Sequence, residues 1–283
     1  MTTYSFYKMS PSGNTTVLIK NKDSMDARYR ALISNKILDP LHLGGEQVGV
    51  VSYLEDGTPR LDMMGGEFCG NATRSVLALL LFEDSKSLKS IGENHWECHL
   101  SVSGVNEKVK GECFRDGSKI NTKVYLSTKN HVEEKLLDGY KVFVAYLSGI
   151  THVILNEPHF KFRKDNYVEF SKHVRDSLEL QNESAVGLIF VQKNDNGVFI
   201  NPVVWVRDTD STYYETACGS GTAAFGIVSA LNNKRDFKER IYQPSKKSIE
   251  LEVRLSSDAL YVESVSIGGI VDVIAKGELF LDD

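Results

Sequence analysis

The sequence has few of the features that would place a protein in a specialised structural class. Its 283 residues include only four cysteines, none in a C-x-x-C pair, and only six prolines. The absence of cysteine pairs argues against a structural zinc site, and isolated thiols are typical of a reducing compartment. Positive charge is not in excess: the formal net charge of −5 argues against general nucleic-acid or membrane binding.

Long apolar runs are also missing. The densest one, "ALLLF" at residues 78–82, ends at Glu83 and is too short to span a membrane. The first residues, "MTTYSFYKMSPSG", do not combine a basic region with an apolar stretch, so no signal peptide is expected and the predicted location is the cytoplasm. There is no lysine context for pyridoxal phosphate and no nucleotide-binding loop, so the sequence predicts neither a cofactor nor a metal.

The order of predicted elements repeats along the chain. With 41% hydrophobic and 25% charged residues, a chain of this length suggests about two globular domains. In each half, a helix is followed by two strands, a cysteine and a second helix. The helices are expected at 25–38, 71–84, 167–180 and 222–232, and "NDNG" at 194–197 predicts a hairpin turn. This order suggests duplication of one α+β unit.

A short phrase also recurs about half a chain apart. "EFCGNATRS" contains Cys69, and "ETACGSGTAA" contains Cys218. In both phrases a glycine follows the cysteine and a helical pattern begins. The other two cysteines, Cys98 and Cys113, lie in strand-like stretches, where an ordinary buried thiol is expected.

Thiols at two matching helix starts predict a particular chemistry. The positive end of a helix dipole favours a thiolate and therefore lowers the expected thiol pKa. Two opposed thiols suit inversion at a carbon acid, one removing a proton and the other delivering one to the opposite face. The backbone N–H groups expected to bind a carboxylate belong to Gly70, Asn71, Gly219 and Ser220. The alternative is that both cysteines are simply buried thiols of a duplicated scaffold.

The motifs "FCGNATR" and "ACGSGTAA" together resemble the paired cysteine motifs of the diaminopimelate epimerase family of cofactor-independent amino-acid racemases. The resemblance covers the whole chain, through "SPSGNTTVLI", "GGEQVGVV" and "LSGITHVIL". It implies two similar α+β domains, each a barrel-like mixed sheet around a central helix, with the active site between them. It places one domain at 1–125, with a C-terminal strand at about 267–283, and the other at 126–266.

The resemblance also implies roles for individual residues. Cys69 and Cys218 are the acid/base pair, and His152 tunes the thiols. Asn14 and Gln47 match substrate-contacting positions, and the helix-start N–H groups hold the α-carboxylate. For Asn14 a simple turn role stays open, and His152 could instead be a hydrogen-bonded core histidine.

Several positions depart from diaminopimelate epimerase. The family's Gly-Asn-Pro-His pattern is "GITH" at 149–152, an expected asparagine is Ala185, and the Glu-Arg pair aligns with "VR" at 206–207. Each lost polar partner of the distal end of diaminopimelate would cost about 1–3 kcal/mol. The sequence instead suggests an apolar or aromatic distal pocket, formed by Met63, Met64, Ile150, Tyr213 and Tyr214. The acids that could accept a ring N–H are Glu46, Asp208, Asp210 and Glu215, although for most of them singly a solvated loop charge is the favoured interpretation.

The two cysteine phrases are most similar to the histidine racemase branch of this family, which serves staphylopine-type metallophore synthesis. The resemblance therefore implies an isomerase acting on a small amino acid, with a homodimer left open. Within the family, the alternatives are a diaminopimelate epimerase or a racemase of another amino acid. A hydroxyproline epimerase or related isomerase is a further alternative. Outside enzymes, a non-catalytic amino-acid-binding or thiol-redox protein is the competing hypothesis.

Overall fold

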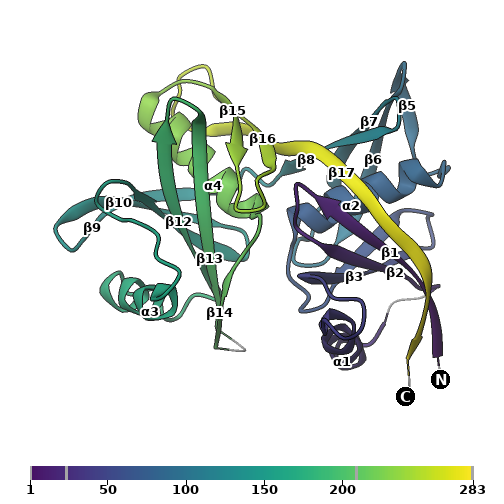
Figure 1. Ribbon diagram of the computed structural model, residues 1–283. Helices are drawn as coiled ribbons and strands as arrows, with labels where there is room; N and C mark the ends of the chain where they lie inside the picture. The colour runs from purple at the N-terminus through teal and green to yellow at the C-terminus, as the bar shows by residue number, and fades with distance from the viewer. Residues whose placement is uncertain (1, 23–24, 208–209, 282–283) are drawn as a thin grey trace. The chain divides into compact units, whose positions relative to one another are not determined.

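The chain forms two compact units. The structure, a computed structural model, describes residues 2–22, 25–207 and 210–281. Unit 1 comprises Met1–Tyr125 and Gly268–Asp283, and unit 2 comprises Leu126–Ile267, so the division falls within the last strand, β17 (Val262–Leu281). Figure 1 shows the elements of both units. That the two units act as racemase domains stays a prediction.

Unit 1 is a closed mixed barrel. Its strands pair in the order β1–β2–β3–β4–β6–β7–β8–β17, and β17 pairs back to β1. The pairs β2–β3 and β4–β6 are parallel, and β5 extends the sheet beside β6. The strands are β1 (Thr2–Pro11), β2 (Thr16–Lys20), β3 (Gln47–Tyr53), β4 (Pro59–Met63), β5 (Lys89–Gly92), β6 (His95–Val102), β7 (Val109–Asp116) and β8 (Lys119–Leu126).

The barrel of unit 1 encloses one helix and carries another on its outer surface. The enclosed helix, α2 (Gly70–Phe82), is buried at every position through Leu81 and contacts six of the strands around it. Its second half, from Val76 to Leu81, is apolar on all sides, and the polar side chains of its first turns, such as Arg74, are hydrogen-bonded within unit 1. Helix α1 (Ala27–Leu38) buries Ile33 and Ile37 against side chains from the outer face of the barrel.

Unit 2 repeats this plan. Its strands pair in the order β9–β10–β11–β12–β13–β15–β16, with parallel pairs β11–β12 and β13–β15 and with β14 also bound to β13. The strands are β9 (His131–Leu137), β10 (Tyr140–Leu147), β11 (Ile150–Asn156), β12 (Ala185–Asn194), β13 (Gly197–Val206), β14 (Ser211–Tyr214), β15 (Phe237–Tyr242) and β16 (Ser248–Leu255). The sheet curls around α4 (Gly219–Asn233), which contacts both β10 and β16.

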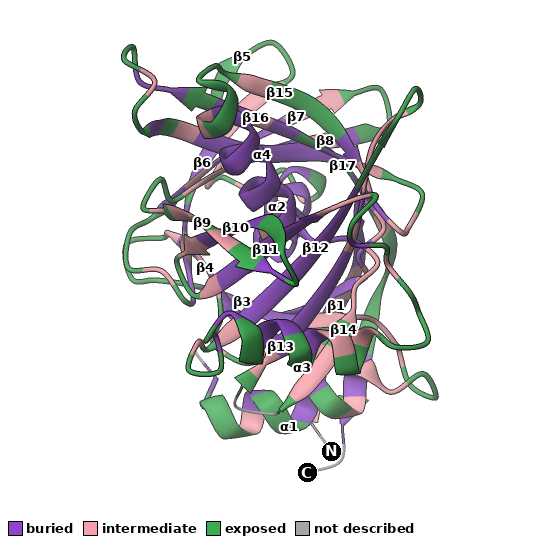
Figure 2. Cartoon of the chain, turned by 90° about the vertical axis from the view of Figure 1, so that its left-hand side faces the viewer, coloured by how far each residue is buried: buried purple, intermediate pink, exposed green. Residues whose placement is uncertain are grey.

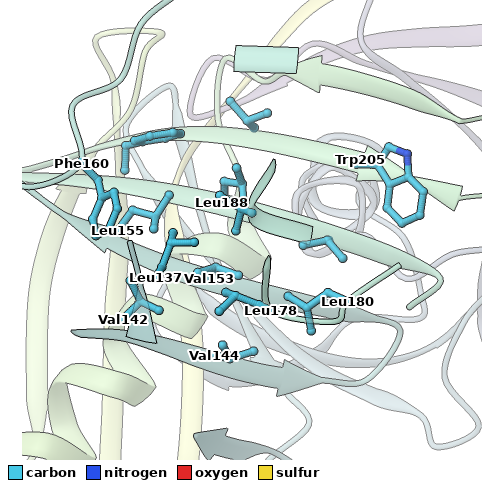
Figure 3. Close-up of a cluster of buried hydrophobic side chains, with 14 residues drawn as sticks. Leu137, Val142, Val144, Val153, Leu155, Phe160, Leu178, Leu180, Leu188 and Trp205 are labelled. Atoms are coloured by element: carbon cyan, nitrogen blue, oxygen red, sulfur yellow. The ribbon is translucent and has the colours of Figure 1, made fainter. Parts of the chain in front are cut away.

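The outer face of the unit 2 sheet is covered by α3 (Tyr167–Ser177). Figure 3 shows the buried cluster there, including Leu188 on β12 and Trp205 on β13. The Arg175 guanidinium of α3 lies 4.1 Å from the centre of the Trp205 ring. In Figure 2 the two enclosed helices, α2 and α4, are coloured as buried over most of their length, whereas α1 and α3 carry exposed residues along one side.

The observed elements confirm the fold class expected from the sequence. All four predicted helices are present, and the "NDNG" turn joins β12 to β13 with Asn194 paired to Gly197. Cys98 and Cys113 are buried strand residues, and burial raises their pKa values to about 11 and about 12. Within the described ranges, no helix is long and apolar enough to cross a membrane.

Candidate active site

Cys69 is the N-cap residue of α2. Its backbone is extended (φ −131°, ψ 111°), and its Sγ accepts a hydrogen bond from the Ala72 backbone N–H at 3.3 Å. The Thr73 hydroxyl donates to the Cys69 carbonyl at 2.8 Å. This capping places the sulfur at the positive end of the helix, where the N–H groups of residues 70 and 71 precede the first helical hydrogen bond.

Gln47, on strand β3, is hydrogen-bonded to the Cys69 thiol. It is the first residue of β3, and its Oε1 accepts a hydrogen bond from Cys69 Sγ at 2.8 Å. The sequence assigned Gln47 to the substrate. The structure adds a direct contact with the thiol itself, which positions the sulfur and its proton.

Asn14 belongs to the same polar cluster of unit 1. It lies in the turn between β1 and β2, where its N–H donates to the Pro11 carbonyl at 3.1 Å. Its buried side chain donates to Glu46 Oε2 at 3.0 Å, and the Thr15 N–H donates to Glu46 Oε1 at 3.3 Å. Because Glu46 directly precedes Gln47, the structure brings Asn14, Glu46, Gln47 and Cys69 together, and both roles considered for Asn14 remain open.

Cys218 repeats the geometry of Cys69 in unit 2. It is the N-cap residue of α4 (φ −122°, ψ 110°), and its Sγ accepts from the Gly221 N–H at 3.3 Å. The Thr222 hydroxyl donates to the Cys218 carbonyl at 2.7 Å, as Thr73 does in unit 1. The repeated Cys-Gly-x-x-Thr spacing is therefore a capping motif in both units.

The electrostatic setting of Cys218 corrects an expectation from the sequence. The helix start was expected to lower the thiol pKa, but the pKa of Cys218 is raised well above its ordinary value. The largest cause is burial, and the nearby Glu215 carboxylate raises the pKa further. The Ser220 hydroxyl, 3.5 Å from Sγ, and the Gly221 N–H oppose this only in part. In unit 2 the thiol is therefore the favoured form.

Replacement of Glu215 by glutamine is expected to lower the pKa of Cys218. The change removes the negative charge that disfavours the thiolate and keeps the size of the side chain. The rate of Cys218 alkylation by iodoacetamide, mapped by mass spectrometry at each pH, should reach its half-maximum at a lower pH in Glu215→Gln. Glu179→Gln, an exposed acid elsewhere in unit 2, is the matched control. An unchanged Cys218 profile in Glu215→Gln would contradict the assigned influence.

His152 lies in the interior of unit 2. It is 0% exposed, on β11, opposite Ala145 of β10 and Gly187 of β12. Burial lowers its pKa to about 3, and the Gly187 backbone opposes this only weakly, so the ring is neutral at physiological pH. Within the described chain neither ring nitrogen has a hydrogen-bond partner. The buried position expected of a core histidine is therefore observed, and both interpretations of His152 stay predictions; tuning of the thiols would have to come from a neutral ring.

The expected apolar distal pocket is wrong for Met63 and stays a prediction for its other four residues. Met63 is fully buried inside the barrel beside Gly49, and Met64 packs against the core beneath α1. The Tyr214 ring stacks on Phe162, with ring centres 4.5 Å apart, at the edge of the unit 2 core. Met63 therefore fills the core, Met64 and Tyr214 are partly buried against the cores, Ile150 is half-buried and Tyr213 is exposed.

The candidate acids also separate into groups. Asp210 accepts a hydrogen bond from the Trp205 indole at 2.9 Å, which makes it a structural residue. Asp208 lies outside the described residues. Glu46 and Glu215 remain, one in the Asn14 cluster and the other beside the Cys218 thiol.

Sequence reasoning missed two buried polar residues that support the helix starts. Arg74 of α2 is fully buried and donates to Ser12, Asn71 and Thr122 within unit 1. Gln243, which follows β15, accepts from the Cys218 N–H. Arg74 stands in the quoted cysteine phrase and could have been noticed, whereas no local pattern links Gln243 to Cys218.

A capped thiol at the start of each enclosed helix, in two units of one plan, defines the class of diaminopimelate epimerase-like racemases and epimerases. A solved structure with this fold is the hydroxyproline epimerase from Agrobacterium vitis with bound trans-4-hydroxy-L-proline. The two match with a TM-score of 0.70 and 12% identity, over 99% of this chain and 93% of that chain.

Sequence comparison identifies the family. The model described as the histidine racemase CntK N-terminal domain matches residues 3–280. The chain is 31% identical to a histidine racemase of Fusobacterium nucleatum over 98% of this chain and 97% of that protein. It is 26% identical to the histidine racemase of Staphylococcus aureus, over 98% and 97% of the two chains. The chain belongs to the histidine racemase family and is an isomerase.

Proposed function

We propose that this protein interconverts L- and D-histidine with Cys69 and Cys218 and without pyridoxal phosphate. The observation that carries the proposal is the repeated N-cap geometry of the two thiols in a chain of this family. The named activity of the relatives from Fusobacterium nucleatum and Staphylococcus aureus supports histidine as the substrate.

In the proposed mechanism one thiolate removes the α-proton and the opposite thiol donates a proton to the other face. The carbanion exists only between these two transfers, and each turnover leaves the two sulfurs with exchanged protonation states. Burial and Glu215 keep Cys218 protonated in the resting enzyme. Cys69 is therefore assigned the thiolate; once it has lost the proton that it donates to Gln47 Oε1 in the structure, its Sγ keeps the hydrogen bond from the Ala72 N–H. The reverse reaction begins from the other protonation state.

The substrate carboxylate is assigned to the helix starts. The backbone N–H groups of Gly70, Asn71, Gly219 and Ser220 lie in the first turns of α2 and α4, at positive dipole ends that suit an α-carboxylate. This interaction also stabilises the negative charge that develops on the substrate in the transition state.

The imidazole is assigned to the acids beside the thiols. Glu46 is oriented by Asn14 and Thr15, and Glu215 lies at Cys218, so either carboxylate can accept a ring N–H. Met63 is fully buried in unit 1 and does not take this role. The contact assigned to the imidazole is therefore the polar one with these carboxylates.

The test is hydrogen exchange in D₂O. The protein is incubated separately with L-histidine, D-histidine and L,L-diaminopimelate; loss of the α-proton signal is followed by NMR, and the products are separated on a chiral column. Exchange of histidine with formation of its enantiomer would support the proposal. Exchange with diaminopimelate alone would assign the protein to the epimerase reaction, and no exchange would favour the binding or thiol-redox alternative.

The cellular setting is part of the proposal. The four cysteines are all free thiols, which suits the cytoplasm. D-Histidine would be consumed there by metallophore synthesis, as the resemblance implies. A homodimer stays a prediction, which light scattering of the purified protein would decide.

A further inference from the structure

A closed hydrogen-bond ring surrounds the backbone of Cys218. The Cys218 N–H donates to Gln243 Oε1 at 3.1 Å, and Gln243 Nε2 donates to the Thr222 hydroxyl at 3.1 Å. The Thr222 hydroxyl donates in turn to the Cys218 carbonyl at 2.7 Å. Both polar groups of the Cys218 main chain are therefore held by one amide and one hydroxyl.

The ring also determines the orientation of the Gln243 amide. A backbone N–H can only donate, so the oxygen of the amide must face Cys218 and its nitrogen must face Thr222. The nitrogen also donates to the Ile241 carbonyl at 3.1 Å. Gln243 is only 4% exposed, and with these bonds its buried amide is satisfied at both ends.

The turn that carries Gln243 holds the same segment at a second point. The Ser245 N–H donates to the Thr216 carbonyl at 3.0 Å, two residues before Cys218. The turn itself is closed by the Gln243 N–H, which donates to the Lys247 carbonyl at 2.9 Å. The chain entering α4 is thus fixed from outside the helix.

Unit 1 uses the corresponding turn for the same purpose with a different residue. Ser103 follows β6, the strand that pairs in parallel with β4 as β15 pairs with β13. Its hydroxyl accepts from the Met63 N–H at 2.9 Å and donates to the Glu67 carbonyl at 2.8 Å. It thereby links the two ends of the loop that leads to Cys69. In both units, a residue that follows a strand after the enclosed helix thus hydrogen-bonds to the segment that leads to the cysteine.

We propose that Gln243 is a positioning residue for Cys218, which fixes the direction of the Sγ atom by holding the N–H and, through Thr222, the carbonyl of that residue. The direction of Sγ depends on the backbone angles of the N-cap, and these two groups define the orientation of the flanking peptides. If this ring of hydrogen bonds is broken, Sγ can move away from the Gly221 N–H and from the position in which it exchanges a proton with the substrate. This proposal rests on the proposed function, because it assigns Gln243 to the thiol that acts as acid.

The first test is Gln243→Leu, which keeps most of the volume and removes the amide. A displacement of about 1 Å at a reacting group can lower a rate by about 10²-fold. We therefore expect kcat for histidine inversion to fall by about 10²-fold with KM changed by less than about threefold, since the lost positioning acts in the transition state. Gln192→Leu, an exposed glutamine on β12, is the matched control and should keep wild-type kcat.

The second test breaks the ring at its other member. Thr222→Val removes the hydroxyl in nearly the same shape and should show the same loss in kcat. Thr222→Ser keeps the hydroxyl and should keep wild-type kcat. Each variant is assayed below its Tm, with folding checked by circular dichroism, so that a loss of stability alone does not count as a loss of kcat.

A readout independent of activity completes the test. Alkylation of Cys218 by iodoacetamide at pH 9 should become at least about threefold faster in Gln243→Leu, because the loosened loop admits the reagent, while the rate at Cys69 stays constant. Folded Gln243→Leu and Thr222→Val proteins with wild-type kcat and wild-type Cys218 alkylation would overturn the proposal. If the wild-type protein exchanges no histidine, the proposed function fails, and the alkylation rates still decide the role of Gln243.

Discussion

Replacement of either Cys69 or Cys218 by alanine is expected to lower histidine inversion by about 10²–10⁴-fold in both directions, because that is the typical contribution of one positioned acid or base. Each variant lacks the proton acceptor of one direction and the proton donor of the other, and inversion in either direction needs both groups. The measurement is the initial rate of D-histidine formation from L-histidine, and of the reverse reaction, on a chiral column.

The other two cysteines provide matched controls. Cys98→Ala and Cys113→Ala remove thiols that are buried in the strands of unit 1, with pKa values raised by burial to about 11 and about 12. These variants should keep the rate of inversion and lose only some stability. Substantial inversion by Cys69→Ala or by Cys218→Ala, in protein shown to be folded, would reject the mechanism with two thiols.

Gly187→Ala is expected to destabilise unit 2 by about 3 kcal/mol, at the upper end of the typical cost of overpacking a core. A methyl group at this position would lie 2.1 Å from His152 Nδ1 and 2.5 Å from its Cε1. The ring is fully buried and belongs to the strand paired with that of Gly187, so it has no solvent-exposed space to move into. Guanidinium unfolding followed by circular dichroism measures the loss.

A double-mutant cycle tests whether the His152 ring causes the loss of stability in Gly187→Ala. In a His152→Ala background the ring is absent, so Gly187→Ala should then cost less than about 1 kcal/mol, and the two substitutions should couple strongly. Gly92→Ala on the exposed β5 is the control, because a methyl group there meets only ordinary contacts at 3.6 Å. Equal costs of Gly187→Ala with and without His152 would show that the ring is not what requires glycine.

The two thiols at the helix starts could be predicted because their signal is local and repeated. A cysteine followed by glycine and a helical pattern appears twice, and both cysteines are N-caps of enclosed helices. The apolar residues of these helices recur at helical spacing, so the helices themselves were also predictable. The distal pocket was not, because an apolar side chain such as Met63 looks the same in sequence whether it lines a site or fills a core.

The charge state of the thiols shows the same limit. The sequence places Cys218 at a helix start and so predicts a lowered pKa, but burial and the Glu215 carboxylate raise it. Desolvation depends on everything that surrounds a group, including strands far away in the chain. The same is true of His152, whose pKa is lowered to about 3 by its burial between β10 and β12.

The sequence by itself determined the duplicated α+β plan, the class of chemistry and the two cysteines, because hydrophobic periodicity and a repeated motif are properties of neighbouring residues. Only the tertiary structure decided which acids stand beside the thiols, that His152 is neutral, and that Gln243 holds the Cys218 backbone. These features arise where strands distant in sequence meet around an enclosed helix, and their energies depend on burial and on hydrogen-bond geometry across those contacts.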